Sequence, residues 1–363
     1  MTTGRRATSM DVADVAGVSQ PTVSRALRGE GSVSAETRDR ILAAARELNY
    51  VPDERAARLR SRSTGVVALV ILGLPGQERA AINPFYFELL GAVGSAAAKR
   101  GYDLLVSFQD HPDTLRADFE QARKADGLIV LGSSRNAAGW RFFAKAMERG
   151  DRIVCWGAPD DAVPVVRCGN RAGAILAVRH LLDQGRRRIA FVGPGWRGHR
   201  AFRERRNGYR AALMAAGETS LEARGIEEMD RREQGRAMTE ALLLGGAGCD
   251  AVFAASDLLA LGAIDALDRA GVRVPEEVAV VGFDGIPAAA HARPALTTIE
   301  QDTDAAGKLL VDALLAQVEG RGRPRPGVPC RLVVRGSSDP LCLGTQEHAR
   351  TASPWSGRVA VAA

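Results

Sequence analysis

The sequence predicts two kinds of structure in one chain: a small all-α module at the N-terminus and a much larger α/β region with parallel sheets. Short, capped helical patterns separated by glycines fill residues 8–50. From Gly65 onward, continuous apolar runs of strand length alternate with helical stretches, a pattern typical of parallel strands covered on both faces. A chain of 363 residues also exceeds the usual size of one domain.

The first two helices of the N-terminal module are marked by their caps. Thr8 is a suitable N-cap, Asp11 stands three residues later as in a capping box, and Gly17 suits the left-handed residue that ends a helix. Ser19 is the expected cap of the second helix, with Pro21 in its first turn. Two short helices joined by a glycine-containing turn form a helix-turn-helix, whose second helix enters a DNA major groove.

A third helix is expected after Ser34, with an apolar face made by Ile41, Leu42, Ala45 and Leu48. The alternative for all three helices is a helical hairpin within a larger enzyme. The segment 53–62 follows; it carries four arginines and is too short and too charged to form a stable helix alone. It is expected to fold when phosphates neutralise it, and the alternative is a plain charged linker.

The net charge of +6 is unevenly placed. Residues 1–64 carry a net +3, and the remaining, much longer part of the chain carries only as much again. This concentration is typical of a polyanion-binding module at the N-terminus, and a solvated basic face is an equal alternative on charge alone.

The composition argues against several classes of protein. No apolar run reaches the length of a membrane helix, no secretory signal begins the chain, and the five cysteines form no C-x-x-C motif. No cofactor, metal site or membrane partner is therefore expected, and a reducing cytoplasm is the expected location. Residues 341–363 are expected to form a flexible tail, with no heptads for a tetramerisation helix.

The large region predicts an α/β fold with parallel sheets, and its size favours two lobes. Ligands of such folds bind beyond the carboxyl ends of the strands. The expected strands are 66–72, 104–108, 127–131, 152–156, 188–192, 251–254 and 278–283, and the expected helices include 85–100, 115–124, 173–184, 207–216, 231–244 and 258–270.

Several stretches together resemble the lac repressor (LacI/GalR) family over about residues 8–340. In the N-terminal module they are 18–27 (VSQPTVSRAL), 33–38 (VSAETR) and 48–52 (LNYVP). In the large region they include 83–86 (NPFY), 187–193 (RRIAFVG), 203–209 (RERRNGY), 255–262 (ASDLLALG), 281–284 (VGFD) and 296–299 (LTTI). The resemblance implies a helix-turn-helix headpiece with a hinge helix, and a two-lobed core like a periplasmic binding protein.

The resemblance also implies a DNA-binding set. Gln20, Pro21 and Arg25 fall on base-reading positions, although Pro21 has no polar group, so Gln20 and Arg25 are expected to read the bases. In the hinge, Leu59 matches a leucine that wedges into the minor groove, with Ala56 one turn earlier and Arg60 beside it. The remaining members, on or near positions that touch phosphates, are Thr8, Ser19, Thr22, Ser24, Ser34 and Thr37.

For the ligand, the resemblance implies an effector cleft between the lobes. Arg205 matches an effector-binding arginine and Asp284 a ligand-accepting carboxylate; Ser256 falls on a polar cleft position, and Phe85, Tyr86 and Trp156 offer aromatic faces. Each has an ordinary alternative: Phe85 as core, and Arg205 as an ion-pair partner of Glu204 or Asp284. Asp257 is expected to be a helix N-cap. Gly157 and Gly169 replace two commonly acidic residues, which predicts a less acidic and roomier pocket.

The expected domains are a headpiece (1–52), a hinge (53–64), a core (65–340) and the tail. Within the core, lobe 1 is expected at about 65–165 and 296–326, and lobe 2 at about 166–295 and 327–340. The resemblance implies a homodimeric repressor on a palindromic operator, controlled by a small molecule that is a sugar or, alternatively, a purine-like corepressor.

A nicotinamide-dependent oxidoreductase is the rival from another class, because residues 193–198 match G-x-G-x-x-G and Glu218 follows them.

Overall fold

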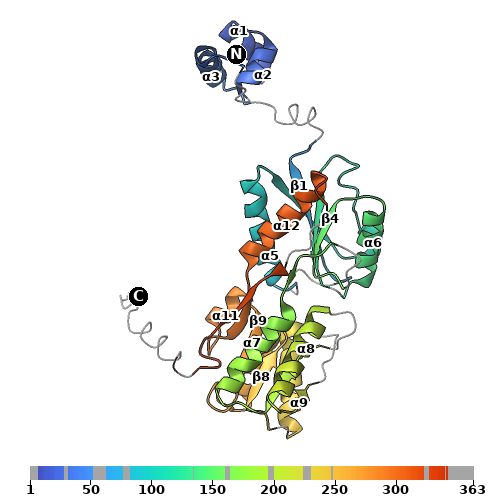
Figure 1. Cartoon of the computed structure of the whole chain (residues 1–363), viewed down its shortest axis with the longest axis vertical. Coiled ribbons are helices and arrows are strands. Elements are labelled where there is room, and N and C mark those ends of the chain that lie inside the picture. The colour runs from blue at the N-terminus through green and yellow to red at the C-terminus, as the bar shows by residue number, and fades with distance from the viewer. Residues whose placement is uncertain are drawn as a thin grey trace, which may run out of the picture. The chain divides into compact units, whose positions relative to one another are not determined.

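Figure 1 shows the computed structural model of the chain. It describes residues 7–27, 32–51, 63–76, 82–133, 135–159, 164–194, 200–223, 230–246, 248–322, 327–339 and Leu341. The chain divides into two compact units, Met1–Thr64 and Gly65–Ala363, which we describe separately. The predicted hinge residues Ala56, Leu59 and Arg60, and the predicted tail beyond Leu341, lie outside the described residues.

The N-terminal unit contains three helices, α1 (Ser9–Ala16), α2 (Gln20–Leu27) and α3 (Ala35–Glu47), among its described residues. Val12, Val23 and Ile41 are fully buried where the three helices meet. The predicted apolar face of α3 is wrong at Leu42, which is 39% exposed. Ala44 takes its place in the core, because positions three and four residues apart share one face of a helix.

The larger unit begins with a four-stranded parallel sheet in the order β2-β1-β3-β4. Its strands are β1 (Val66–Leu72), β2 (Asp103–Gln109), β3 (Leu128–Gly132) and β4 (Ile153–Trp156). Alternate residues of β1 enter two different cores, one shared with α5 (Phe85–Lys99) and α12 (Thr303–Val318), the other with α6 (Ala137–Glu148). Since helices cover both faces, β1 is a continuous apolar run.

The second lobe is built on a six-stranded sheet in the order β12-β10-β9-β8-β6-β7, in which only β12 runs antiparallel to its neighbour. The strands are β6 (Ile189–Val192), β7 (Leu221–Glu222), β8 (Ala251–Ala254), β9 (Ala279–Asp284), β10 (Thr297–Gln301) and β12 (Cys330–Val333). Its helices are α7 (Asn170–Asp183), α8 (Arg200–Ala215), α9 (Arg231–Leu244), α10 (Asp257–Arg269) and α11 (Pro287–His291); α7 packs on α8, and α9 on α10.

The chain passes between the lobes after β4, after β10 and after α12 (Figure 1). Two of these crossings pair as short parallel strands, β5 (Arg167–Cys168) and β11 (Gly327–Val328). The expected lobe boundary at residue 296 is wrong by one strand, because β10 pairs with β9 and therefore belongs to lobe 2. The return to lobe 1 comes only with α12, which packs on α5.

The helix predicted over residues 115–124 is also wrong. This segment forms turns after a short 3-10 helix, η2 (Pro112–Thr114). Gln109 bonds the backbone of Arg116 through both ends of its amide, which holds the chain away from a helical path. Ala117 and Phe119 insert into the core of lobe 1, and Arg123 ends the last turn with a left-handed φ of 51°.

Candidate nucleic-acid interface and ligand cleft

The second helix of the N-terminal unit separates a buried face from an open one. Val23 and Ala26 point into the core, whereas Pro21 and Arg25, one helical turn apart, are exposed. Arg25 Nε donates to the carbonyl oxygen of Pro21 (3.4 Å), so its guanidinium lies along the open face. Gln20 is partly buried and donates to Ser9 Oγ (3.2 Å).

Polar hydroxyls mark the starts of the three helices. Thr8 and Asp11 form the predicted capping box of α1. Ser34 Oγ accepts from the backbone N–H of Thr37 (3.3 Å) at the start of α3. Ser19 precedes α2, and its hydroxyl bonds that of Thr22 (2.8 Å). Of the other predicted phosphate contacts, Ser24 is half-buried on α2. Helix N-termini bearing free N–H groups are suitable sites for phosphate.

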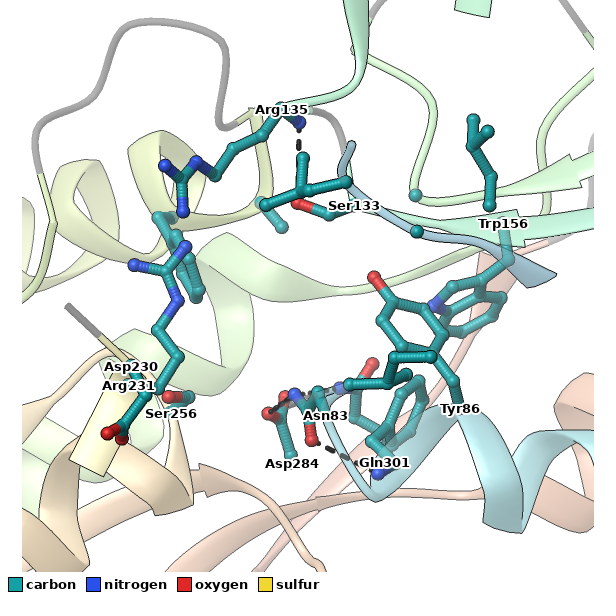
Figure 2. A pocket seen from close by; sticks show the side chains of 18 of the residues that line it. Asn83, Tyr86, Ser133, Arg135, Trp156, Asp230, Arg231, Ser256, Asp284 and Gln301 are labelled. Carbon is teal, nitrogen blue, oxygen red and sulfur yellow. Dashed lines mark hydrogen bonds between the residues drawn. The ribbon is translucent and has the colours of Figure 1, made fainter. Parts of the chain in front are cut away.

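The cleft of the larger unit lies between the two lobes and encloses about 160 Å³. Its walls come from the carboxyl ends of β1, β3, β4, β9 and β10 and from the first turns of α5, α8, α9 and α10. All six predicted effector residues line it: Phe85, Tyr86, Trp156, Arg205, Ser256 and Asp284 (Figure 2). The strand ends predicted to hold a ligand are thus brought together.

A buried ion pair stands at the base of the cleft. Arg205 Nη1 donates to Asp284 Oδ1 (3.0 Å), and both side chains are only 5% exposed. Arg205 also donates to Asn170 Oδ1 (2.9 Å) and to the carbonyl oxygen of Ala255 (2.6 Å). Its guanidinium lies 3.6 Å from the ring centroid of Phe283, within cation–π range. Arg205 is therefore an ion-pair partner of Asp284 and, at the same time, a residue of the cleft lining.

The carboxylate of this pair joins the two lobes. Asn83, from lobe 1, donates to Asp284 Oδ2 (3.1 Å), and Gln301, at the end of β10, donates to Oδ1 (2.8 Å) (Figure 2). Asp284 adopts a positive φ of 124°, which non-glycine residues rarely do. Such strain concentrates at binding sites. A ligand that reaches Asp284 must therefore compete with a bond between the lobes.

Aromatic side chains form the lobe 1 wall of the cleft. The ring of Phe85 packs against those of Trp156 (5.8 Å between centroids) and Tyr86 (5.9 Å, edge-on). Phe85 is 4% exposed, so it is a core residue as well as a lining residue. Tyr86 is half-buried at the cleft, and desolvation there raises its pKa, so that the hydroxyl stays protonated and can donate.

Ser256 lines the cleft as expected and also takes the capping role that the sequence assigned to Asp257. Ser256 is the N-cap of α10, while Asp257 lies inside the helix. Asp257 accepts from the backbone N–H groups of Gly285 and Ile286 (both 2.8 Å) and from the Thr298 hydroxyl (2.5 Å). The N-cap prediction for Asp257 is therefore wrong: the buried carboxylate ties the turn after Asp284 to β10. Burial and the charge of Asp284 raise the pKa of Asp257 to about 7.

Sequence reasoning missed Asn83, Asn170 and Gln301 as members of the site. It also missed Arg135, Asp230 and Arg231, which line the cleft mouth (Figure 2). Gly157 lines the cleft, and a Cβ there would lie 2.0 Å from the carbonyl oxygen of Gly132, so this backbone requires glycine. A sequence signal existed for one of them, since Asn83 is the first residue of the NPFY stretch.

Comparisons with known proteins cover both units. A model of bacterial regulatory proteins of the lacI family matches residues 8–53, and one of a periplasmic binding protein-like domain matches residues 178–338. The HTH-type transcriptional regulator CelR of Thermobifida fusca is 35% identical over 344 residues, spanning 91% of this chain and 96% of that protein. The chain belongs to the LacI family.

Further LacI-family proteins resemble it along most of its length. The ribose operon repressor of Halalkalibacterium halodurans is 33% identical over 334 residues, covering 90% of this chain and 96% of that protein. A lac repressor dimer bound to operator and the anti-inducer ONPF matches with a TM-score of 0.72 at 26% identity, over 92% of this chain and 99% of that one. A complex of CelR with cellobiose has a TM-score of 0.67 at 33% identity, over 92% and 100%.

Membership of the LacI family confirms the predicted fold class, a helix-turn-helix headpiece followed by a two-lobed periplasmic-binding-protein-like core. The protein is a DNA-binding transcriptional regulator and not an enzyme, so the oxidoreductase alternative is wrong. Glu218 of that alternative forms an ion pair with Arg187 (3.8 Å), and residues 195–198 of the glycine motif lie outside the described residues. In the part of the chain that the structure describes, no helix combines the length and apolarity that a membrane span needs.

Proposed function

We propose that this LacI-family regulator is a homodimeric repressor of a palindromic operator, acting in the cytoplasm and controlled by a small sugar in the interlobe cleft. The buried Arg205–Asp284 pair carries the proposal, because it meets Asn83 of the opposite lobe beside an aromatic wall. Guanidinium and carboxylate groups bond vicinal hydroxyls, and aromatic faces suit the C–H faces of a sugar ring. The aromatic wall belongs to lobe 1 and the ion pair to lobe 2, so neither lobe alone supplies both kinds of contact.

The names of the relatives favour the same class of effector. The ribose operon repressor is named for a sugar operon, and the solved CelR structure is a complex with cellobiose. A purine-like corepressor is the alternative, and a relative named PurR from Histophilus somni is 26% identical over 320 residues. The cleft favours a sugar, because its polar groups are placed on opposite lobes, where a ring edged with hydroxyls can reach both.

On the DNA side, we assign base reading to Gln20 and Arg25 of α2. Exposure of Arg25 on the open face supports this role, since major-groove readers present long polar side chains there. Thr8, Ser19, Thr22, Ser24, Ser34 and Thr37, near the helix starts, are proposed phosphate contacts. Pro21 is exposed and offers apolar contact alone. The hinge, including Ala56, Leu59 and Arg60, is proposed to order on DNA only when a dimer brings two copies together. The similar lac repressor is a dimer in its solved complex with operator.

Control of DNA affinity is proposed to begin at the Asn83–Asp284 bond. A ligand hydroxyl that bonds Asp284 replaces the Asn83 amide as its partner and changes how the lobes close. Couplings of this kind typically amount to about 1–3 kcal/mol, or roughly 5–150-fold in operator affinity.

The test combines a ligand screen with matched arginine variants. Sugars and nucleobases are screened by thermal shift, the best is titrated by calorimetry, and operator binding is followed by fluorescence anisotropy. Arg205→Ala should abolish the effector response while leaving operator binding of the unliganded protein in place. Arg206→Ala is the control, because Arg206 lies on the same helix but pairs with Glu222 outside the cleft lining. Equal effector affinity in the two variants would refute the assignment of the cleft.

A further inference from the structure

Two cysteines far apart in the sequence meet beside the cleft. Cys168 ends β5, on the first crossing between the lobes, and Cys330 begins β12, just after the third crossing. The Cys330 thiol donates to the carbonyl oxygen of Gly169 (3.6 Å), the residue that follows Cys168, and β11 pairs Val328 with Cys168 two residues before Cys330. Cys168 is buried and lines a small cavity of about 50 Å³ that adjoins the cleft and shares Arg205, Trp156 and Gln301 with it.

The surroundings of Cys330 stabilise a thiolate. Its Sγ lies against the first turn of α7, where the backbone N–H of Gly173 donates to the carbonyl oxygen of Gly169 (2.8 Å). Gly173 permits this approach, because a Cβ there would lie 2.9 Å from the sulfur. The neighbouring Cys168 thiol and the charge of Arg205 lower the pKa of Cys330 to about 7, although burial acts in the opposite direction. Thiolates near helix N-termini and arginines are the reactive ones.

The remaining described cysteines lack these features. Cys155 is fully buried, and burial raises the pKa of its thiol. Cys249 is partly exposed, yet burial raises its pKa as well. Cys330 is also partly exposed, so a small oxidant can reach it. No third histidine, cysteine or carboxylate joins the pair within the described residues, and two thiols alone suit redox chemistry better than a metal site.

We propose that Cys168 and Cys330 form a reversible oxidation site, at which a hydroperoxide converts the two neighbouring thiols into a disulfide beside the effector cleft. The Cys330 thiolate attacks a peroxide oxygen and the O–O bond breaks. With hydrogen peroxide, the released hydroxide takes up a proton as water, and Cys330 becomes a sulfenic acid. The Cys168 sulfur then attacks the Cys330 sulfur, the S–O bond breaks, and a second water leaves with the Cys168 proton. A low-molecular-weight thiol reverses the reaction by exchange.

The disulfide adds a second control to the proposed sugar response, and it goes beyond that function. It would join the first crossing to the strand that follows the third, the segments that must move when the lobes close. Cys168 is two residues from Asn170, a direct partner of Arg205. Oxidation is therefore expected to weaken the effect of effector on operator binding, without requiring a change in the headpiece.

The test uses the full-length reduced protein with hydrogen peroxide. Wild type and the control Cys249→Ser should each lose two alkylatable thiols and yield one linked pair of peptides, containing Cys168 and Cys330 and lighter by two hydrogen masses. Dithiothreitol should restore both thiols. In Cys168→Ser, dimedone should trap Cys330 as a sulfenic acid, whereas Cys330→Ser should leave Cys168 unreacted. Peptide mapping assigns every thiol, including Cys342, which lies outside the described residues.

The proposal is overturned if Cys330 reacts no faster than Cys249, or if the linked peptides contain another cysteine. The peptide map of oxidised wild-type protein identifies the linked cysteines even if a serine variant fails to fold. Operator binding with and without effector is then compared for oxidised and reduced protein. An unchanged response in the oxidised protein would refute its regulatory role. A missing response in the reduced protein would instead refute the proposed effector function and leave the oxidation site standing.

Discussion

Asp257 offers a direct test of how the cleft is supported. It is 0% exposed and does not line the cleft, yet it holds the turn after Asp284 through two backbone N–H groups and anchors to the Thr298 hydroxyl. Burial raises its pKa from the ordinary value of 3.8 to about 7. The folded protein therefore contains a carboxyl group that ionises near neutral pH at a cost to stability.

The substitution Asp257→Asn removes the charge and keeps the geometry. The amide oxygen can accept from Gly285 and Ile286 as the carboxylate oxygen does. The amide nitrogen then faces the Thr298 hydroxyl, which can rotate to accept instead of donate. All three hydrogen bonds survive, and only the ionisation is lost.

The sign and size of the effect follow from the two pKa values. The folded pKa, about 7, lies above the unfolded one, so the proton binds the folded state more tightly. This contribution to stability is complete below the unfolded pKa and is lost as the pH rises through 7. At about 1.4 kcal/mol per pKa unit, the whole loss is about 4 kcal/mol, of which about 2.5 kcal/mol falls between pH 5 and pH 8.

Urea unfolding of wild type and Asp257→Asn at several pH values measures this difference. Groups that titrate in both proteins, such as His180, cancel when the two stabilities are subtracted. Wild type should lose about 2.5 kcal/mol relative to the variant from pH 5 to pH 8. Asp265→Asn, at a partly exposed carboxylate on the same helix, controls for the loss of an acidic residue. Parallel curves for wild type and Asp257→Asn, or a wild type that gains stability relative to the variant as the pH rises, would refute the reasoning.

Three further predictions concern packing and caps. Ile41→Ala, at a fully buried site in the small headpiece core, should cost about 2–5 kcal/mol and abolish operator binding, while calorimetry still detects effector binding by the core. Thr8→Ala should lower headpiece stability by about 1 kcal/mol in thermal unfolding, and no change would contradict the capping box. Gly262→Ala should destabilise the core by about 3 kcal/mol, because its Cβ would lie 1.9 Å from the Arg232 carbonyl oxygen. Thermal unfolding measures both glycine variants. In the control Gly91→Ala, the added Cβ has no neighbouring atom within 4 Å, so this variant should be as stable as wild type or more stable.

Local features of the fold were predictable where neighbours in sequence decide them. The capping box of Thr8, the cap at Ser34 and the helix Arg231–Leu244 depend on residues within a few turns, and the structure agrees with the prediction at each. The segment 115–124 was predicted wrongly because Gln109, outside the window, bonds across it. A helical pattern of residues says nothing of such a competing partner.

The site was predictable only in part, for the same reason. Arg205 and Asp284 could be named because they lie in recognisable stretches of the LacI family. The Asn83–Asp284 bond joins residues 201 positions apart, and the meeting of Cys168 with Cys330 likewise depends on how the crossings pair. The cysteines form no C-x-x-C motif, and their spacing along the sequence carries no information about which strands become neighbours.

The hydrogen bonds of Arg205 connect elements on either side of the crossings between the lobes. Through Asn170 it holds the start of α7, which directly follows the first crossing. Through Asp284 it is linked to Gln301, which directly precedes the second. The same carboxylate reaches Asn83 in lobe 1. A ligand that takes the Arg205–Asn170 or the Gln301–Asp284 hydrogen bond changes the anchoring of a crossing, and one that takes the Asn83–Asp284 bond changes a contact between the lobes. A pocket deep within one lobe would have no such consequence, which supports the proposal that a ligand at this ion pair controls DNA binding.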